Sequence, residues 1–477
     1  MERATSATCP EPERQTLPTF FCALLLASLA CAPLASAQQQ QEIGQILERL
    51  DRLERQNAAL LVEVQQLRQQ VSGVEKPAVA PATAAPEAVE KLAESVAVQS
   101  ARIEEQAQSK VESLQRMPIR ITGMALFNAY TNSRSEGSYF SPLATHSTAS
   151  RGAGGTLSQS IFGLEFFGPG TFLGGKIRGN VQMDFYPYAT AYATAPTGAA
   201  AEGLTPRLRT GSISIDWGSR VIMVGREKPL IAIRNPDSLA QVGLPPLSYA
   251  GNLWEWQPQI RVEQNFNLSA DTSITAQAAL FSTREANTAV PEYLAPTLAA
   301  NRPGWEGRVQ FAHRRGDESF FEIAPGFHYS ISHVVGESIP SRLVSLDGLL
   351  RPLHSVELSG SFFAGQNAAG LGGLGPGFRV SNGGDAYAVN SRGGWLQLAL
   401  FPTQRLSFHF FGGAQINRPA DLVGYYPQSN ISFAGNVYYR LAPNVYLAFE
   451  AAQARTRWTN GLTHLRNHYD LALAYMF

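Results

Sequence analysis

The sequence predicts an all-β transmembrane barrel of about sixteen antiparallel strands, preceded by a periplasmic α-helical coiled coil. Three observations lead to this prediction. Apolar and polar residues alternate with a period of two in most segments after Pro118, and the connections between these segments are alternately short and long. Only 16% of the residues are charged, against about 25% in ordinary soluble domains. Beyond the first forty residues, no apolar run is long enough for a membrane-spanning helix.

The amino-terminal segment 1–37 has the features of a signal peptide. An apolar stretch from Phe20 to Leu34 is too short to cross a bilayer and is followed by Ala35-Ser36-Ala37, the small-x-small pattern that signal peptidase cleaves. All three cysteines precede this site, so the mature chain would have no disulfide, thiol nucleophile or cysteine metal site. An alternative is that Cys31 accepts a lipid anchor. Both interpretations predict export.

Residues 38–76 show a heptad repeat. Apolar residues alternate at spacings of three and four, which keeps one narrow seam facing a partner helix and predicts a coiled coil of identical chains. Asn57 occupies one core position, where it disfavours slipped alignments. An amphipathic helix packed on its own domain is the alternative. The predicted oligomerisation residues are Ile43, Ile46, Leu50, Leu53, Asn57, Leu60, Val64, Leu67, Val71 and Val74.

A Pro/Ala-rich linker at 77–88 and a second, less regular helix at 89–117 follow the coiled coil. Pro118 ends this helix because proline cannot continue the backbone hydrogen-bond ladder. Neither segment contains a recognisable catalytic group, so we interpret them as a spacer.

Residues 118–477 are predicted to form the barrel. In the segment Lys176–Phe185 one face is apolar and the other carries Lys176, Arg178 and Asp184. Short turns alternate with long loops, which is typical of outer-membrane barrels with periplasmic turns and extracellular loops. An even number of strands places both ends of the barrel on the periplasmic side. A secreted soluble β protein would have to cover the same apolar face with a second layer.

The last strand ends on Tyr475-Met476-Phe477. This ending resembles the carboxy-terminal signal by which the barrel-assembly machinery recognises its substrates, so Tyr475 and Phe477 are predicted to form an assembly signal.

A barrel of sixteen strands has a lumen too wide for side chains to fill. The third long loop, 228–256, contains Pro229, Pro236, Gly243, Pro245 and Pro246 and is predicted to fold inward, with Lys228, Arg234, Asp237 and Glu255 as constriction-loop candidates. Strand parity gives as pore-lining candidates Arg120, Lys176, Arg178, Asp184, Arg220, Arg226, Arg261, Glu263, Arg308 and Arg440.

From Pro118 onward there are 27 basic and 23 acidic residues, and 25 of the basic residues are arginines. Rings of guanidinium groups in a pore favour anions. The alternative is that these arginines pair with inward carboxylates and hold the wall rigid. As a set, they predict a weak anion preference.

The remaining patterns carry no chemistry that we recognise. The net charge of +0 gives no nucleic-acid footprint, and the eight histidines have no metal-ligand spacing, so we expect no metal, no cofactor and no enzymatic activity. His468 and Asp470 are expected to form a polar pair in the lumen. The Gly-rich stretch 370–377 lacks the Lys-Ser/Thr of a phosphate-binding loop and is expected to be a flexible external loop.

The order of signal peptide, coiled coil, sixteen strands and terminal Phe resembles the DcaP-like porin family. The resemblance covers the architecture of the mature chain and rests on the heptads at 43–74, the first strand Gly123–Tyr130 and the ending Tyr475–Phe477. It implies homotrimers, a periplasmic trimeric coiled coil and uptake of small anionic organic solutes such as dicarboxylates. Phosphate-selective porins share a similar plan. The neutral charge balance and the irregular helix at 89–117 depart from the DcaP-like pattern.

The sequence thus predicts a trimeric, water-filled diffusion channel for small hydrophilic, anionic solutes in a bacterial outer membrane, with its amino-terminal helices in the periplasm. Its expected partners are copies of itself, outer-membrane lipid, the barrel-assembly machinery and small anionic solutes. The principal alternative is a structural protein whose coiled coil tethers the membrane to the cell wall. An adhesin is disfavoured because the loops are rich in Gly and Ala.

Overall fold

The computed structural model describes residues 119–133, 145, 151–186, 206–283, 303–316, 319–334, 337–380 and 385–477. The predicted signal peptide, coiled coil, linker and second helix, with all ten heptad residues, lie outside the described residues. Within the described part of the chain, no helix is long and apolar enough to cross a membrane.

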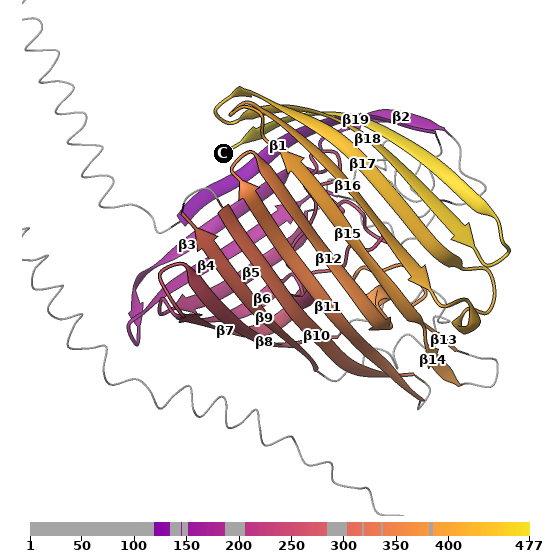
Figure 1. Cartoon of the computed structure of the whole chain (residues 1–477), viewed down its shortest axis with the longest axis horizontal. Coiled ribbons are helices and arrows are strands. Elements are labelled where there is room, and N and C mark those ends of the chain that lie inside the picture. The colour runs from indigo at the N-terminus through magenta and orange to yellow at the C-terminus, as the bar shows by residue number, and fades with distance from the viewer. Residues whose placement is uncertain are drawn as a thin grey trace, which may run out of the picture. The chain divides into compact units, whose positions relative to one another are not determined.

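Sixteen antiparallel strands form one closed barrel (Figure 1). Each strand pairs with the next in the chain, and the last pairs with the first. The strands of the first half are β1 (Ile119–Asn132), β3 (Ile161–Phe172), β4 (Gly175–Asp184), β5 (Arg207–Asp216), β6 (Arg220–Glu227), β7 (Gln257–Asn267), β8 (Thr272–Phe281) and β9 (Gly304–Arg315). Those of the second half are β10 (Ser319–Val334), β11 (Glu337–Leu353), β12 (Val356–Gln366), β15 (Asn390–Leu400), β16 (Leu406–Asn417), β17 (Pro427–Ala442), β18 (Val445–Trp458) and β19 (Thr463–Met476).

Three short strands and three 3₁₀ turns complete the described structure. Strand β2 (Gly152–Thr156) continues the line of β3 and pairs with the far end of β1, so it adds no further position to the wall. Strands β13 (Phe378–Val380) and β14 (Ala386–Ala388) form a small separate hairpin in the loop between β12 and β15. The 3₁₀ turns are η2 (Leu230–Ala232), η4 (Ala369–Leu371) and η5 (Pro419–Asp421).

The period-two alternation of the sequence becomes the two faces of the wall. In β17, Ile431 and Phe433 are exposed on the outer face, whereas Asn430 and Ser432 are buried on the inner face. The same division holds around the barrel, because register pairs such as Ile431 with Arg455 and Asn430 with Thr456 place neighbours on the same side. The predicted barrel of sixteen antiparallel strands is therefore confirmed.

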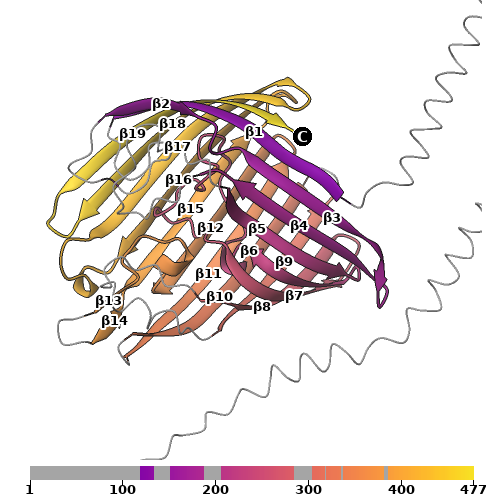
Figure 2. The ribbon, with the colours of Figure 1, turned by 180° about the vertical axis from the view of Figure 1, so that it is seen from behind.

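The barrel closes between β1 and β19 (Figure 2). At the carboxyl end of β19, Gly123 and Phe477 exchange two backbone hydrogen bonds of 2.9 and 3.1 Å. A Cβ atom at position 123 would lie 2.4 Å from the Ile161 oxygen and 2.7 Å from the Phe477 ring. Only glycine fits where three strands meet this closely.

Strand register corrects two of the pore-lining predictions. Asp216 of β5 pairs with Val221 of β6, and Val221 with Glu263 of β7, so the odd-numbered residues of β6 face inward. Arg220 and Arg226 are even-numbered and lie on the outer face, where the Arg220 Nε donates to the Gln264 Oε1 at 2.9 Å. The even-numbered residues face inward in β5 and the odd-numbered residues in β6, because the tight turn around Gly218 shifts the alternation. The sequence alone does not reveal this shift.

Candidate functional site

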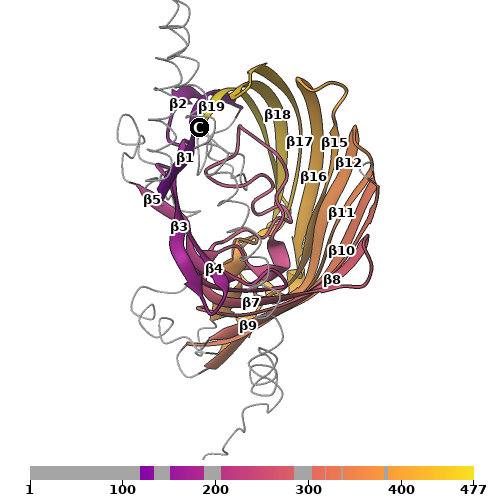
Figure 3. The ribbon, with the colours of Figure 1, turned by 90° about the vertical axis from the view of Figure 1, so that its left-hand side faces the viewer.

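The loop 228–256 lies inside the barrel (Figure 3). Its apolar residues Leu230, Ile231 and Leu247 are at most 2% exposed, although the loop joins β6 to β7 at the end of the barrel where the long loops lie. Turn η2 packs against the inner faces of β9, β10 and β11, and the Leu230 N–H donates to the Glu306 Oε2 at 2.6 Å. This part of the loop therefore lies against the inner face of the wall.

The middle of the loop crosses the lumen along a line of polar side chains from the wall. The Asp237 N–H donates to the Gln397 Oε1 of β15 at 2.7 Å, and the Gln397 Nε2 donates back to the Asp237 Oδ2 at 2.6 Å. Further on, the Ser238 hydroxyl and the Gln241 amide both donate to the Glu450 carboxylate of β18 at 2.6 and 2.7 Å. These contacts give buried polar groups of the wall hydrogen-bond partners in the loop, and Glu450 also accepts from the Asn436 amide at 3.1 Å.

Loop residues 239–243 are held by β1, by Gln159 before β3, and by Arg209 of β5, which donates to the Val242 oxygen at 2.8 Å. The Gln159 Oε1 accepts from the Val242 and Gly243 N–H groups at 2.9 and 2.8 Å, while its Nε2 donates to the Ala240 oxygen. Asn128 of β1 donates to the Leu239 oxygen at 2.9 Å. The loop is thus held against the inner wall at several points between Leu230 and Gly243.

Four charged groups form a compact cluster where the loop meets β9, β10 and β11. The Arg308 guanidinium is fully buried. It forms a bidentate ion pair with Asp347 through Nε and Nη2 at 2.8 Å each, and its Nη2 lies 3.2 Å from Glu322. Arg234 of the loop contacts the same two carboxylates, Asp347 at 3.3 Å and Glu322 more closely. Two cations and two anions cancel, so this cluster anchors the loop and leaves no net charge for the pore.

A second cluster lies on β4 and β5. Asp184 is fully buried and accepts from Arg207 at 2.6 Å and from Arg209 at 2.7 Å, so one carboxylate serves two guanidinium groups. Both arginines stack over the Trp256 ring, at 5.4 and 4.8 Å from its centre. Here the positive charge exceeds the negative charge by one.

Lys228 and Arg261 border this second cluster. The Arg261 Nη2 donates to the Lys228 oxygen at 2.6 Å and its Nη1 lies 3.6 Å from Glu263. Burial, reinforced by the charge of Arg209, lowers the pKa of Lys228 to about 8. For Asp237, burial acts to raise the pKa, but hydrogen bonds from His409 and Gln397 outweigh it and hold the pKa below its ordinary value. The loop therefore carries an ammonium group that titrates near neutral pH.

Four of the predicted pore-lining cations lie near the turn end of the barrel. The Arg120 side chain is 69% exposed and reaches Glu165 only at 3.9 Å, a distance at which an exposed pair contributes little. Lys176 and Arg178 are exposed on the inner face of β4. Arg440 also faces inward, opposite Tyr446 of β18. These groups, unlike Arg308, remain accessible to a solute in the lumen.

A second loop also folds into the barrel, which corrects the expectation of a flexible external segment at 370–377. The Trp254 N–H donates to the Leu371 oxygen at 2.9 Å, and the Glu255 N–H donates to the same oxygen at 3.2 Å. Gln257 donates to the Gly370 oxygen, and the Leu374 N–H donates to the Gln415 Oε1 at 2.8 Å. Glycine is needed here for close approach, since a Cβ at 372 would lie 2.7 Å from the Trp254 indole.

The expected pairing of His468 with Asp470 is replaced by separate contacts with β1. The Asp470 Oδ1 accepts from the Asn128 amide at 2.9 Å, and the His468 Nδ1 lies 2.8 Å from the Asn132 Oδ1. Both side chains are buried. Among the described residues, no group of three or more His, Cys, Asp and Glu side chains has a metal-binding arrangement.

Several site residues were not predicted. Arg207 and Arg209 were missed because simple alternation places the even-numbered residues of β5 on the inner face. A bulge between β4 and β5 shifts the register, and these two odd-numbered arginines then face the lumen. Gln159, Glu322 and Asp347 anchor the loop, but a lone inward polar residue carries no sequence signal for its partner. Trp256 could have been noticed as an aromatic residue at the loop end.

The barrel resembles solved outer-membrane proteins in its fold. The crystal structure of the outer-membrane channel DcaP of Acinetobacter baumannii is similar, with 13% identity and a TM-score of 0.59 over 75% of this chain and 97% of that one. The barrel has the fold of DcaP. An anion-selective porin from Comamonas acidovorans is also similar, with 10% identity and a TM-score of 0.50 over 75% of this chain and 99% of that one.

The fold-level resemblance to DcaP that the sequence predicted is thus confirmed. No family model matches the chain, and no curated protein sequence matches it either.

Proposed function

We propose that the protein is an outer-membrane porin through which small hydrophilic solutes diffuse passively. The observation that carries this proposal is a closed barrel of sixteen strands with an apolar outer face, a polar inner face and a loop fixed across its lumen. Such a wall suits a bilayer outside and water inside. The similarity to DcaP and to the Comamonas porin supports it at the level of the fold.

The test is reconstitution of the purified full chain in a planar bilayer. A porin gives discrete conductance steps that grow with the salt concentration and need no energy source. If the folded protein inserts and conducts nothing, the proposal is wrong.

We further propose a mild preference for anions. Support comes from the single positive charge left over at Arg207, Arg209 and Asp184, from Lys228 and from the exposed cations Arg120, Lys176 and Arg178. Guanidinium groups bind carboxylates through paired donors, so small organic anions such as dicarboxylates are the proposed solutes. Reversal potentials under a salt gradient, repeated with a dicarboxylate salt, test this, and a cation-selective current would refute it.

The assembly is proposed to be a homotrimer held by a periplasmic coiled coil at 38–76 and inserted by the barrel-assembly machinery, which would recognise Tyr475 and Phe477. The heptad pattern supports the coiled coil. Trimeric porins give conductance in steps of three. A chain that lacks residues 38–76 and still forms trimers would show that the barrel suffices.

The tether to the cell wall remains the alternative function, supported by the coiled coil and the linker. A tether need not conduct. If deletion of 38–117 detaches the outer membrane while the channel conductance persists, both functions reside in one chain.

A further inference from the structure

The outer wall of the barrel carries a group of arginines that the channel function does not use. Arg342 of β11, Arg392 of β15, and Arg455 and Arg457 of β18 are exposed and occupy outward register positions. We call these four residues the outer arginine group. In the described parts of β10 to β19, no carboxylate occupies an outward position of these barrel strands. This part of the outer face is therefore purely cationic.

The height of the outer arginine group coincides with one edge of the apolar band. Arg342 lies eleven residues from Leu353 at the turn end of β11, and Arg455 lies ten residues from Val445 at the turn end of β18. A tilted strand needs about 9–11 residues to cross the hydrocarbon core. The guanidinium groups of Arg342 and Arg455 thus lie where hydrocarbon ends and headgroups begin, on the side of the long loops, and Arg392 lies two register positions nearer the turns than Arg342.

The arginines are held in place by their neighbours. The Arg455 Nε donates to the Gln453 Oε1 at 2.8 Å, and the Gln453 Nε2 donates to the Asn467 Oδ1 at 2.8 Å, all on the outer face. Arg455 also lies over the Phe433 ring at 5.8 Å, and Arg342 over the Tyr329 ring at 5.6 Å. These contacts orient the side chains without neutralising them.

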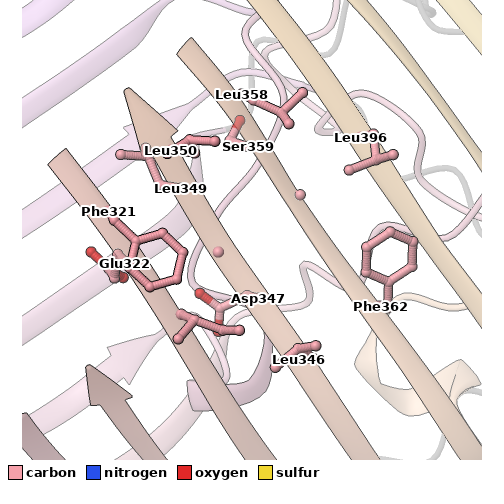
Figure 4. Close-up of a pocket in the computed structure, with 13 residues that line it drawn as sticks. Phe321, Glu322, Leu346, Asp347, Leu349, Leu350, Leu358, Ser359, Phe362 and Leu396 are labelled. Carbon is pink, nitrogen blue, oxygen red and sulfur yellow. The ribbon is translucent and has the colours of Figure 1, made fainter. Parts of the chain in front are cut away.

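An apolar groove lies below Arg342 on the same outer wall (Figure 4). Gly348 of β11 and Gly360 of β12 form its floor, and it has a volume of about 200 Å³. The sticks of Phe321, Leu350 and Leu358 border one part of the groove and those of Leu346 and Phe362 another. The outward residues Arg342, Val344, Leu346 and Gly348 lead from the arginine to the groove. Arg342 and Leu346 are four residues apart, about 13 Å along the strand.

We propose that this wall binds a phosphorylated lipid of the outer leaflet, with the phosphate groups on Arg342 and Arg392 and one acyl chain in the groove. Arg342 and Arg392 are two strands apart and offset by two residues in register, which is about 12 Å in all, and guanidinium is the side chain best suited to phosphate. The groove is lined almost wholly by apolar side chains and faces the hydrocarbon, so an acyl chain is the occupant it fits. The site lies outside the pore and is independent of its selectivity.

Binding is tested with the full chain in a neutral detergent and diphosphoryl lipid A as the probe. Lipid retained on the folded protein is measured by native mass spectrometry, with dephosphorylated lipid A and phosphatidylglycerol as comparison lipids. The parent protein is expected to bind diphosphoryl lipid A at least tenfold more tightly than either. Equal affinity for the dephosphorylated lipid would overturn the role of the arginines. Equal affinity for phosphatidylglycerol would overturn the assignment to the outer leaflet.

Variants separate the two parts of the site. Arg342→Gln combined with Arg392→Gln should weaken diphosphoryl lipid A at least tenfold and leave the dephosphorylated lipid unchanged. Leu346→Trp, which fills the groove, should weaken both. Arg220→Gln removes an outer-face arginine near the opposite end of the barrel and should change neither. If the double arginine variant keeps its barrel, as judged by heat-dependent mobility on gels, and still binds like the parent, the proposal is refuted.

Discussion

Release of the inward loop is the most direct test of how the lumen is narrowed, and Arg234 is the residue to change. Its guanidinium belongs to the loop and binds two wall carboxylates, Glu322 and Asp347, while Arg308 binds the same pair from the wall. Arg234→Gln removes the contact between loop and wall, but Arg308 still neutralises much of the carboxylate charge. The wall should therefore remain folded while the loop loses one of its anchors.

The size of the effect follows from the two lost charged contacts. Hydrogen bonds to charged groups contribute about 1.5–3 kcal/mol, and the Arg234 side chain is only 19% exposed, so solvent screening is limited. Arg308 still holds both carboxylates, so we take the two lost contacts together as about 2–3 kcal/mol, which raises the ratio of released to docked loop roughly 30- to 150-fold, because about 1.4 kcal/mol corresponds to a factor of ten. The other anchors, such as Asp237 with Gln397, keep the docked form in the majority.

The assay is single-channel recording in a planar bilayer. The variant should show brief excursions to a higher conductance at least thirty times as often as the parent, on top of a similar main level. Arg220→Gln, an outer-face arginine, serves as the matched control and should record like the parent. An Arg234→Gln channel with the parental record would mean that the charged cluster does not hold the loop.

Three further predictions concern the pore and the seam. Raising the pH from 7 to 9 should reduce anion selectivity, because the pKa of Lys228 is about 8 and its ammonium is lost as the pH rises through that value; Lys228→Arg should abolish this pH dependence in reversal-potential measurements. Asp184→Asn leaves Arg207 and Arg209 without their shared carboxylate, so the reversal potential should shift further toward anions, and an opposite shift would contradict the assignment of these arginines to the pore. Gly123→Val should prevent closure of the barrel, since a Cβ there would lie 2.4 Å from a backbone oxygen of β3. The gel mobility typical of a heat-resistant barrel should then be lost. Gly461→Ala, in an open turn, should keep that mobility.

The fold was predictable because apolar residues on the outer face and polar residues on the inner face alternate along each strand, which gives the sequence a period of two. The alternation in 176–185 recurs as β4, and the alternation at the carboxyl end recurs as β19. Alternation does not show whether the even-numbered or the odd-numbered residues face inward after a turn. Strand parity placed Arg220 and Arg226 in the pore, whereas the register of β5 with β6 turns them outward.

The site was predictable only in outline. The order of loop 228–256 in the chain suggested its inward course, but its anchors depend on contacts between residues far apart in the sequence, such as Gln159 with Val242. The inward course of 370–377 was missed for a different reason. Glycines there were interpreted as freedom of the backbone, whereas in the folded chain they permit close packing against Trp254.

The same distinction bears on selectivity, because the number of arginines overstates the field in the pore. Arg308 and Arg234 are neutralised by the carboxylates they bind, and a buried pair of this kind interacts mainly with itself. The charges that a solute can meet are instead the incompletely balanced ones, Lys228 in the loop and Lys176 and Arg178 on β4. If this is so, Arg178→Gln should shift the reversal potential toward cations more than Arg308→Gln does, even though Arg308 lies beside the loop and Arg178 nearer the turns. A larger shift from Arg308→Gln, in a barrel that keeps its parental conductance, would show that the buried cluster contributes to the field directly.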